Sequence, residues 1–186
     1  MTLDESQRRR LLELGYESIA HGLESGRRAS WQSPGDPGLA IRRATFITLR
    51  RGGELRGCCG TLDVRTTVAE DVWHNAWASA FADPRFLPLM PHEYAGLDLQ
   101  ISVLSPLEPL AAASEDALIE TLRPQVDGLL LEAGAKRATF LPAVWEQVPE
   151  PRQFVMQLKR KAGWSLHDWP VGLCAYRYTT ESFGDG

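Results

Sequence analysis

The sequence predicts a layered α+β fold, and three of its features support that prediction. Segments that alternate apolar and polar residues, as β-strands do, occur in pairs joined by short turns that contain glycine. Amphipathic segments of moderate length, typical of α-helices, separate these pairs. The chain shows no regular βαβ alternation and no repeat of about 20 to 50 residues, which argues against a parallel doubly wound sheet and against a solenoid.

The first part of the chain is expected to hold a helix followed by a hairpin. Apolar residues recur at helical spacing from Asp4 to Glu24. The turn-rich stretch from Ser25 to Gly38 then reads as a surface loop. Residues 40–50 and 54–62 predict a β-hairpin across Gly52-Gly53, because two glycines supply the positive φ angles that such a turn needs.

Seven further elements are expected after the hairpin, followed by a tail. An apolar stripe over 67–81 predicts a helix, which Asp83-Pro84 ends. Residues 97–104 alternate with the period of a half-buried strand. The rest are, in order, a helix over 114–122, a hairpin of strands 128–132 and 137–141, a helix over 151–162, a strand over 173–180, and a frayed tail from Ser182 to Gly186.

Composition narrows the class of protein. The 186 residues suffice for one domain or two small ones, and the 44% hydrophobic and 24% charged residues are typical of a globular protein. No apolar run approaches the roughly 20 residues that span a bilayer, and the N-terminus lacks a signal-peptide stretch, so we expect a cytoplasmic protein with no membrane segment. The net charge of −4 disfavours binding to DNA or RNA.

The segment Leu55-Arg56-Gly57-Cys58-Cys59-Gly60 stands out as the candidate functional site. On a regular strand the side chains of Arg56, Cys58 and Gly60 share one face. Glycine weakens a strand, and close approach of another backbone or of a ligand usually compensates. We therefore expect this hexapeptide to contact either a ligand or a tightly packed neighbouring segment.

The hexapeptide resembles the signature of the Ammecr-type domain, known in prokaryotes as protein A of the AmmeMemoRadiSam system. The family pattern has Ile where this chain has Cys59. Further ordered matches cover nearly the whole chain: Asp83-Pro84-Arg85-Phe86, Ile101-Ser102-Val103-Leu104-Ser105, Asp127-Gly128-Leu129, Ala138-Thr139-Phe140-Leu141-Pro142 with Val144-Trp145, and Lys159-Arg160-Lys161-Ala162-Gly163.

This resemblance implies a single Ammecr-type domain over residues 1–186, built as two-layer sandwiches of antiparallel or mixed sheet with helices. It implies a larger and a smaller subdomain, the smaller around residues 50–100, with the hexapeptide at or near a cleft between them. It implies no established reaction. Relatives typically occur beside a Memo-like protein and a radical S-adenosylmethionine protein, so the resemblance implies these partners and a shared modification pathway.

The cysteines allow a catalytic and a structural interpretation. Cys58 could be a nucleophile or sulfur carrier if Arg56 lowers the pKa of its thiol, or it could be a small core residue beside tight glycines. Cys59 and Cys174 are interpreted as core residues. The chain has no Cys-x-x-Cys, His-x-x-x-His or His-Glu-x-x-His pattern, so we expect no metal site, and no cofactor fingerprint occurs.

Asp83, Arg85 and Phe86 form a second candidate site. Their carboxylate and guanidinium could bind a carboxylate or phosphate group, or could pair with each other and close the turn. Thr139 could add a hydroxyl to a binding cleft, although it also fits an ordinary strand position.

Two functions follow from these candidates. The chain could be an enzyme or enzyme subunit that uses Arg56, Cys58 and the segment 83–85 on a small molecule or protein. Alternatively it could be a noncatalytic adaptor that recognises a protein or peptide through Leu55, Arg56, Gly57 and Gly60. The sequence leaves this choice open.

Overall fold

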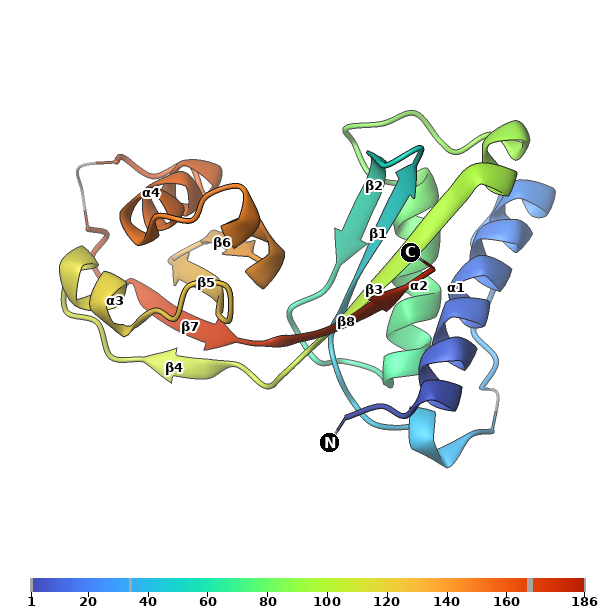
Figure 1. The fold of residues 1–186 in the computed structure, drawn as a ribbon, viewed down its shortest axis with the longest axis horizontal. Coiled ribbons are helices and arrows are strands. Elements are labelled where there is room, and N and C mark those ends of the chain that lie inside the picture. Colours follow the sequence, from blue (N-terminus) through green and yellow to red (C-terminus); the bar gives the residue numbers. More distant parts are fainter. Residues whose placement is uncertain (1, 34, 167–168, 186) are drawn as a thin grey trace. The chain divides into compact units, whose positions relative to one another are not determined.

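The computed structural model describes residues 2–33, 35–166 and 169–185, and the chain divides into two compact units. The first unit comprises Met1–Leu104 with Glu181–Gly186, and the second comprises Ser105–Thr180. Residues 50–100, where we expected a smaller subdomain, therefore lie inside the first unit. Both units combine helices with a β-sheet, so the predicted α+β class is confirmed (Figure 1).

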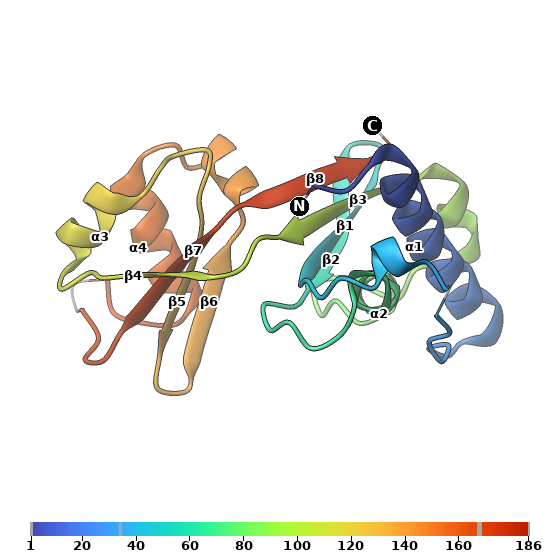
Figure 2. The same cartoon turned by 90° about the horizontal axis from the view of Figure 1, so that it is seen from below.

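A four-stranded sheet with the strand order β2-β1-β3-β8 forms the centre of the first unit. Strand β1 pairs in antiparallel fashion with both β2 and β3. The two long helices pack against one face of this sheet (Figures 1 and 2). The elements are α1 (Glu5–Ser25), β1 (Thr45–Arg51), β2 (Glu54–Gly60), α2 (Val68–Phe81), β3 (Leu97–Leu104) and β8 (Thr180–Gly184), with short 3-10 helices at Pro37–Leu39 and Pro91–Gly96.

Local sequence explains where α1 begins and ends. Asp4 caps the helix by accepting from the backbone N–H of Gln7, whose side chain in turn accepts from the N–H of Asp4. Gly26 ends it in the left-handed conformation at φ 66°. None of the helices in the described part of the chain has the length and apolar character needed to cross a bilayer.

Residues 182–184 of the C-terminal segment lie in strand β8, so the prediction of a frayed tail was wrong for them, and Gly186 lies outside the described residues. The hydroxyl groups of Ser102 and Ser182 lie 2.9 Å apart across β3 and β8. Tyr16 on α1 donates a hydrogen bond to the Asp185 carboxylate. The segment is short and polar and carries glycine, so its local pattern is weak, and pairing with a strand about 80 residues away in sequence orders it.

The second unit is built on a sheet with the order β4-β7-β5-β6, covered by two helices (Figure 2). Its core includes Trp145 and Phe154, whose rings stack 3.7 Å apart. Strand β4 was not expected from the sequence. The elements are β4 (Glu108–Leu110), α3 (Glu115–Thr121), β5 (Gly128–Ala133), β6 (Lys136–Phe140), a 3-10 helix at Pro142–Glu146, α4 (Pro151–Lys161) and β7 (Cys174–Tyr178).

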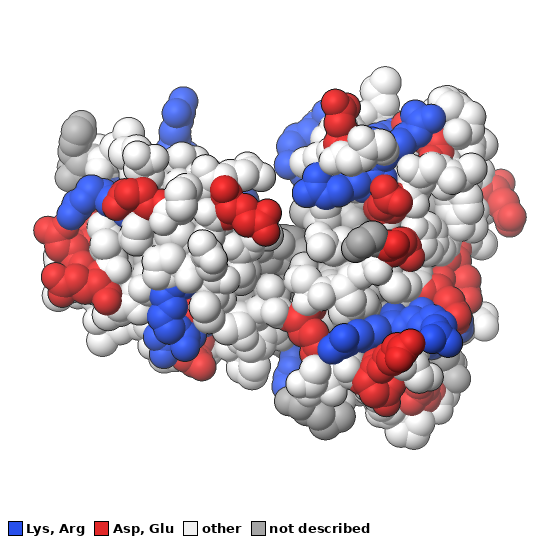
Figure 3. Space-filling view, in the orientation of Figure 1, with Lys and Arg blue, Asp and Glu red and all other residues white. Residues whose placement is uncertain are grey.

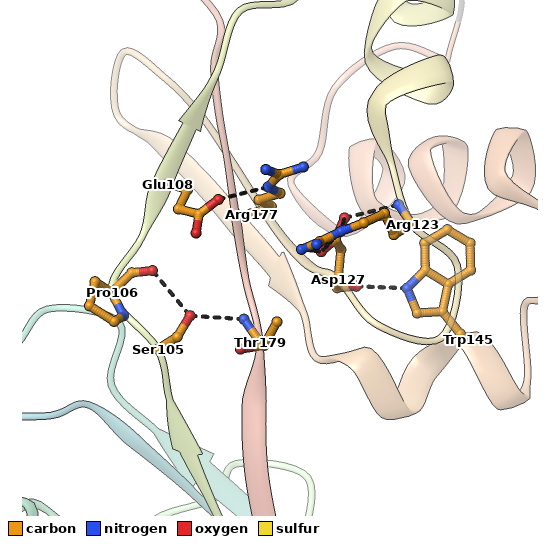
Figure 4. A network of polar contacts seen from close by, with 8 residues as sticks. All are labelled: Ser105, Pro106, Glu108, Arg123, Asp127, Trp145, Arg177 and Thr179. Atoms are coloured by element: carbon orange, nitrogen blue, oxygen red, sulfur yellow. Dashed lines mark hydrogen bonds and ion pairs between the residues drawn. The ribbon is translucent and has the colours of Figure 1, made fainter. Parts of the chain in front are cut away.

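A buried carboxylate organises the turn before β5 (Figure 4). The fully buried Asp127 accepts from the backbone N–H of Arg123 at 2.9 Å and from its guanidinium at 2.6 Å. The carbonyl of Asp127 accepts from the indole N–H of Trp145 at 2.7 Å. The motif residues Asp127 and Trp145 thus have a clear structural role. Figure 4 also shows the contacts Ser105 with Thr179 and Glu108 with Arg177.

Candidate functional site

The hexapeptide lies in β2, at the edge of the first sheet. Cys59 lies opposite the buried Ile47, so it faces the helices like a core residue. Cys58 lies opposite Thr48 and therefore faces the other side of the sheet. The expected opposition of the two cysteines is confirmed.

A β-bulge interrupts the strand at Arg56. The register shifts between Leu49 and Arg50, so that Gly57 lies opposite Leu49 and Leu55 lies opposite Arg50. Arg56 is the extra residue between these pairs. The register places Cys58 and Gly60 on one face, as expected, whereas the bulge interrupts the alternation at Arg56, so strand periodicity does not assign its face.

The two glycines allow close approach of neighbouring segments. A Cβ atom on Gly57 would lie 2.0 Å from the carbonyl oxygen of Ser79 in α2, and one on Gly60 would lie 2.3 Å from the ring of Phe46. The Ser79 hydroxyl accepts from the backbone N–H of Cys59 at 2.8 Å. Of the two compensations expected, packing against another segment is the one that the structure supplies, and a binding role for these glycines stays a prediction.

Asp83 and Arg85 form an internal ion pair beside the hexapeptide. The Asp83 side chain is only 2% exposed and accepts from Arg85 Nη2 at 2.7 Å, from Arg85 Nε at 3.0 Å and from the Cys58 backbone N–H at 2.8 Å. The Arg85 hydrogen bonds hold the pKa of Asp83 down to about 2. Arg85 Nη2 also donates to the Cys58 carbonyl at 3.3 Å, while 54% of its side chain stays exposed.

Arg56 forms a second, bidentate ion pair with Glu93. Its Nε and Nη2 donate to the two carboxylate oxygens at 2.8 and 2.9 Å, and Nη2 also donates to the Leu87 carbonyl at 3.1 Å. These bonds hold the pKa of Glu93 down to about 2. The third nitrogen, Nη1, is buried without a hydrogen-bond partner among the described residues. No local pattern connects Arg56 with Glu93, 37 residues away, so sequence reasoning missed it.

Phe86 lies between the two ion pairs. The guanidinium carbon of Arg85 is 5.5 Å from the centre of its ring, and that of Arg56 is 5.9 Å away. Such cation–π contacts stabilise the positions of both arginines. The structure thus brings Arg56 of the hexapeptide together with Arg85 and Phe86 of the second candidate site.

The thiol of Cys58 has a different environment from the one hypothesised. Its sulfur accepts from the Thr48 hydroxyl at 3.5 Å, whereas the Arg56 guanidinium is engaged by Glu93. Burial, followed by the charge of Asp83, raises the pKa of the Cys59 thiol. Cys174 is exposed, so its interpretation as a core residue was wrong.

Apolar side chains are exposed around the Arg56–Glu93 pair. Leu87, whose carbonyl accepts from Arg56, is 84% exposed, and Met90, whose N–H donates to Glu93, is 54% exposed. Leu55, next to Arg56 in β2, is 38% exposed. We call these five residues, Leu55, Arg56, Leu87, Met90 and Glu93, the Arg56 surface. Basic and acidic side chains alternate over the end of the first unit that carries the β1–β2 hairpin (Figure 3).

Thr139 lies in the second unit, on β6, and so belongs to a different unit from the other candidate residues. Its hydroxyl is buried, donates to the Leu129 carbonyl at 2.9 Å and lies 2.6 Å from the Tyr178 hydroxyl. These contacts suit a structural role. Among the described residues, no group of three His, Cys, Asp or Glu side chains is placed to hold a metal ion.

Comparisons with known proteins identify relatives along most of the chain. The sequence pattern of the AMMECR1 family matches residues 12–183. A protein of Thermofilum pendens is 31% identical, with 93% of this chain and 87% of that protein covered. One of Thermotoga maritima is 34% identical, with 76% and 78% covered. The crystal structure of an uncharacterised protein from Pyrococcus horikoshii matches with a TM-score of 0.86 at 27% identity, covering 95% of this chain and 90% of that one.

Proposed function

This chain belongs to the AMMECR1 family, and on that premise we propose that it is a binding component of a modification pathway, which engages its partners through the Arg56 surface. The partners proposed are a Memo-like protein and a radical S-adenosylmethionine protein. In this role the chain recognises and positions another protein, and the chemistry takes place on its partners.

The observation that carries the proposal is the exposure of Leu55, Leu87 and Met90 around a fixed charge pair. Exposed apolar side chains that gather at one place mark interaction surfaces, and aromatic, Met and Arg residues are enriched there. The bidentate bonds between Arg56 and Glu93 hold the underlying backbone in one conformation. Such preorganisation lowers the entropy lost on binding.

The surroundings of Cys58 favour binding over catalysis by this chain. A nucleophilic thiol is normally activated by a neighbouring base or a free cation. The Cys58 sulfur accepts a hydrogen bond from the hydroxyl of Thr48, which is neither a base nor a cation. Both nearby arginines are neutralised by carboxylates, Arg56 by Glu93 and Arg85 by Asp83.

An experiment with purified partners tests this function. Isothermal titration calorimetry measures the Kd of the protein for the Memo-like and the radical proteins from the same source. We expect Leu87→Glu to weaken binding at least about tenfold, because a charge replaces an apolar contact at the interface. Val171→Glu, at a fully exposed apolar residue of the second unit, is the matched control and should bind like the wild type. Failure of the wild type to bind either partner, or equal binding by all three proteins, overturns the proposal.

A further inference from the structure

A second feature of the first unit, which adjoins the Arg56 surface at Met90, is an apolar groove of about 460 Å³. It lies where α1 and α2 both end, and its size is within the range of about 300 to 1,000 Å³ typical of binding clefts. Its lining comes from three segments: Gly22, Leu23 and Gly26 of α1 and its cap, Trp77 and Phe81 of α2, and Pro88, Leu89, Met90 and Pro91 of the loop that follows.

Packing at the end of the helices explains the aromatic wall of this groove. A Cβ atom on Gly22 would lie 2.4 Å from the Phe81 ring and 3.0 Å from Trp77, so only glycine lets these rings lie against α1. The two rings are 5.5 Å apart. The loop is held against α2 by a 2.8 Å bond from the Leu89 N–H to the Ala80 carbonyl.

The electrostatics of the groove favour a positive charge. The C-terminus of a helix carries a partial negative charge, and neither α1 nor α2 has a basic residue in its last turn. Arg27 and Arg28 follow the cap of α1 but do not line the groove, and Arg28 Nε donates to His74 Nδ1 at 3.0 Å. The described lining residues include no Lys or Arg, and Glu24 in the last turn of α1 is exposed. The rings of Trp77 and Phe81 line the groove, and aromatic rings attract cations.

We propose that this groove binds a segment of a partner protein in which an arginine or lysine adjoins apolar side chains. The apolar residues of the segment contact Leu23, Met90 and the prolines, and its cation lies over the aromatic rings near the two helix ends. The indole N–H of Trp77 is buried and has no hydrogen-bond partner among the described residues. If the Trp77 ring rotates on binding, a backbone carbonyl of the segment can accept a hydrogen bond from this indole N–H. That bond would remove the free-energy cost of the unpaired donor.

The test uses the full-length protein and short capped peptides. The probe is acetyl-Leu-Arg-Leu-amide, and the readout is the indole resonance of Trp77 in ¹H–¹⁵N NMR spectra, assigned with Trp77→Phe. We expect a saturable shift with the arginine peptide. Acetyl-Leu-citrulline-Leu-amide keeps the shape of the side chain without its charge and should bind at least about tenfold more weakly. A neutral side chain gains neither the cation–π attraction nor the attraction of the two helix C-termini.

Two variants at one position give a matched control for charge. Leu23→Lys places a cation in the groove and should abolish the shift, whereas Leu23→Glu should bind the arginine peptide at least as tightly as the wild type. Neither changes the Arg56–Glu93 pair, so partner binding there can be measured independently. The proposal is overturned if the arginine peptide causes no shift, if the citrulline peptide binds equally well, or if methylguanidinium alone binds as tightly as the peptide.

Discussion

The carboxylate of Asp83 accepts a 2.8 Å hydrogen bond from the backbone N–H of Cys58 and so ties the middle of the hexapeptide to the loop after α2. Ser79 makes the neighbouring bond, from the N–H of Cys59. The N–H groups of adjacent residues in a strand point to opposite sides, so that of Cys58 faces the free edge of β2 and that of Cys59 faces β1. Because Asp83 accepts from the N–H of Cys58 and Arg85 donates to its carbonyl, another strand cannot pair at that point. A partner is therefore not expected to add a strand to this edge through backbone hydrogen bonds, and we expect it to contact the side chains of the Arg56 surface.

Replacement of Asp83 by Asn should lower the free energy of unfolding by about 2 kcal/mol, because Arg85 loses its buried ionic partner while the amide can still accept from Cys58. Urea denaturation at pH 7 measures this change. Asp116→Asn removes an exposed ion pair with Arg152 and should leave the urea midpoint essentially unchanged. Equal effects of the two substitutions would contradict the structural role of Asp83.

The ion pair of Glu93 predicts a specific loss of stability in acid. Its pKa is about 2 in the folded protein and 4.5 as the ordinary value, so the unfolded chain takes up a proton first as the pH falls. The ionised Glu93 carboxylate therefore stabilises the folded protein above about pH 4.5, and this stabilisation is lost as the pH falls through 2. Allowing for solvent screening, we expect the free energy of unfolding to fall between pH 7 and pH 2 by on the order of 1 to 2 kcal/mol less in Glu93→Gln than in the wild type.

Urea denaturation of the wild type and of Glu93→Gln between pH 7 and pH 2 measures that difference. The two curves should converge at the acid end. Parallel curves over the whole range would mean that the carboxylate of Glu93 has a similar pKa in both states, contrary to its bidentate contact with Arg56.

Gly57→Ala should be among the most destabilising substitutions in the first unit. The new Cβ would lie 2.0 Å from a backbone oxygen of Ser79, so strand β2 and helix α2 would have to separate. A loss of about 3 kcal/mol or more is expected from such overpacking. Gly96→Ala is the control, because its Cβ would have no neighbour closer than 3.9 Å. A melting temperature lowered equally in both variants would refute this account.

Alkylation by iodoacetamide, followed by mass spectrometry of peptides, separates the three thiols. Cys174 is exposed and should react first, while Cys59, whose pKa is raised by burial, should react more slowly at pH 7. The thiol of Cys58 should be alkylated no faster than that of Cys174. If Cys58 instead reacts fastest in the native protein, its thiol is activated, and the alternative function as an enzyme subunit gains support.

Local patterns were sufficient for most elements and insufficient for the C-terminal strand and for the bulge in β2. The helix that begins at Asp4 and the hairpin across Gly52-Gly53 depend on capping and turn chemistry within a few residues, so both were predicted. Strand β8 depends on its neighbour β3, about 80 residues earlier, and was taken for a frayed tail. The bulge at Arg56 was missed because it is defined by the register between β2 and β1, which the sequence of β2 alone does not show.

By itself the sequence determined the α+β class, the position of the hexapeptide in a strand, and the opposition of Cys58 to Cys59, because each follows from periodicity along a short segment. Only the tertiary structure decided that Glu93 binds Arg56, that Asp83 holds Cys58, and that Leu87 and Met90 lie beside them. These contacts join residues 25 to 37 positions apart, and packing of the loop after α2 against β2 selects them.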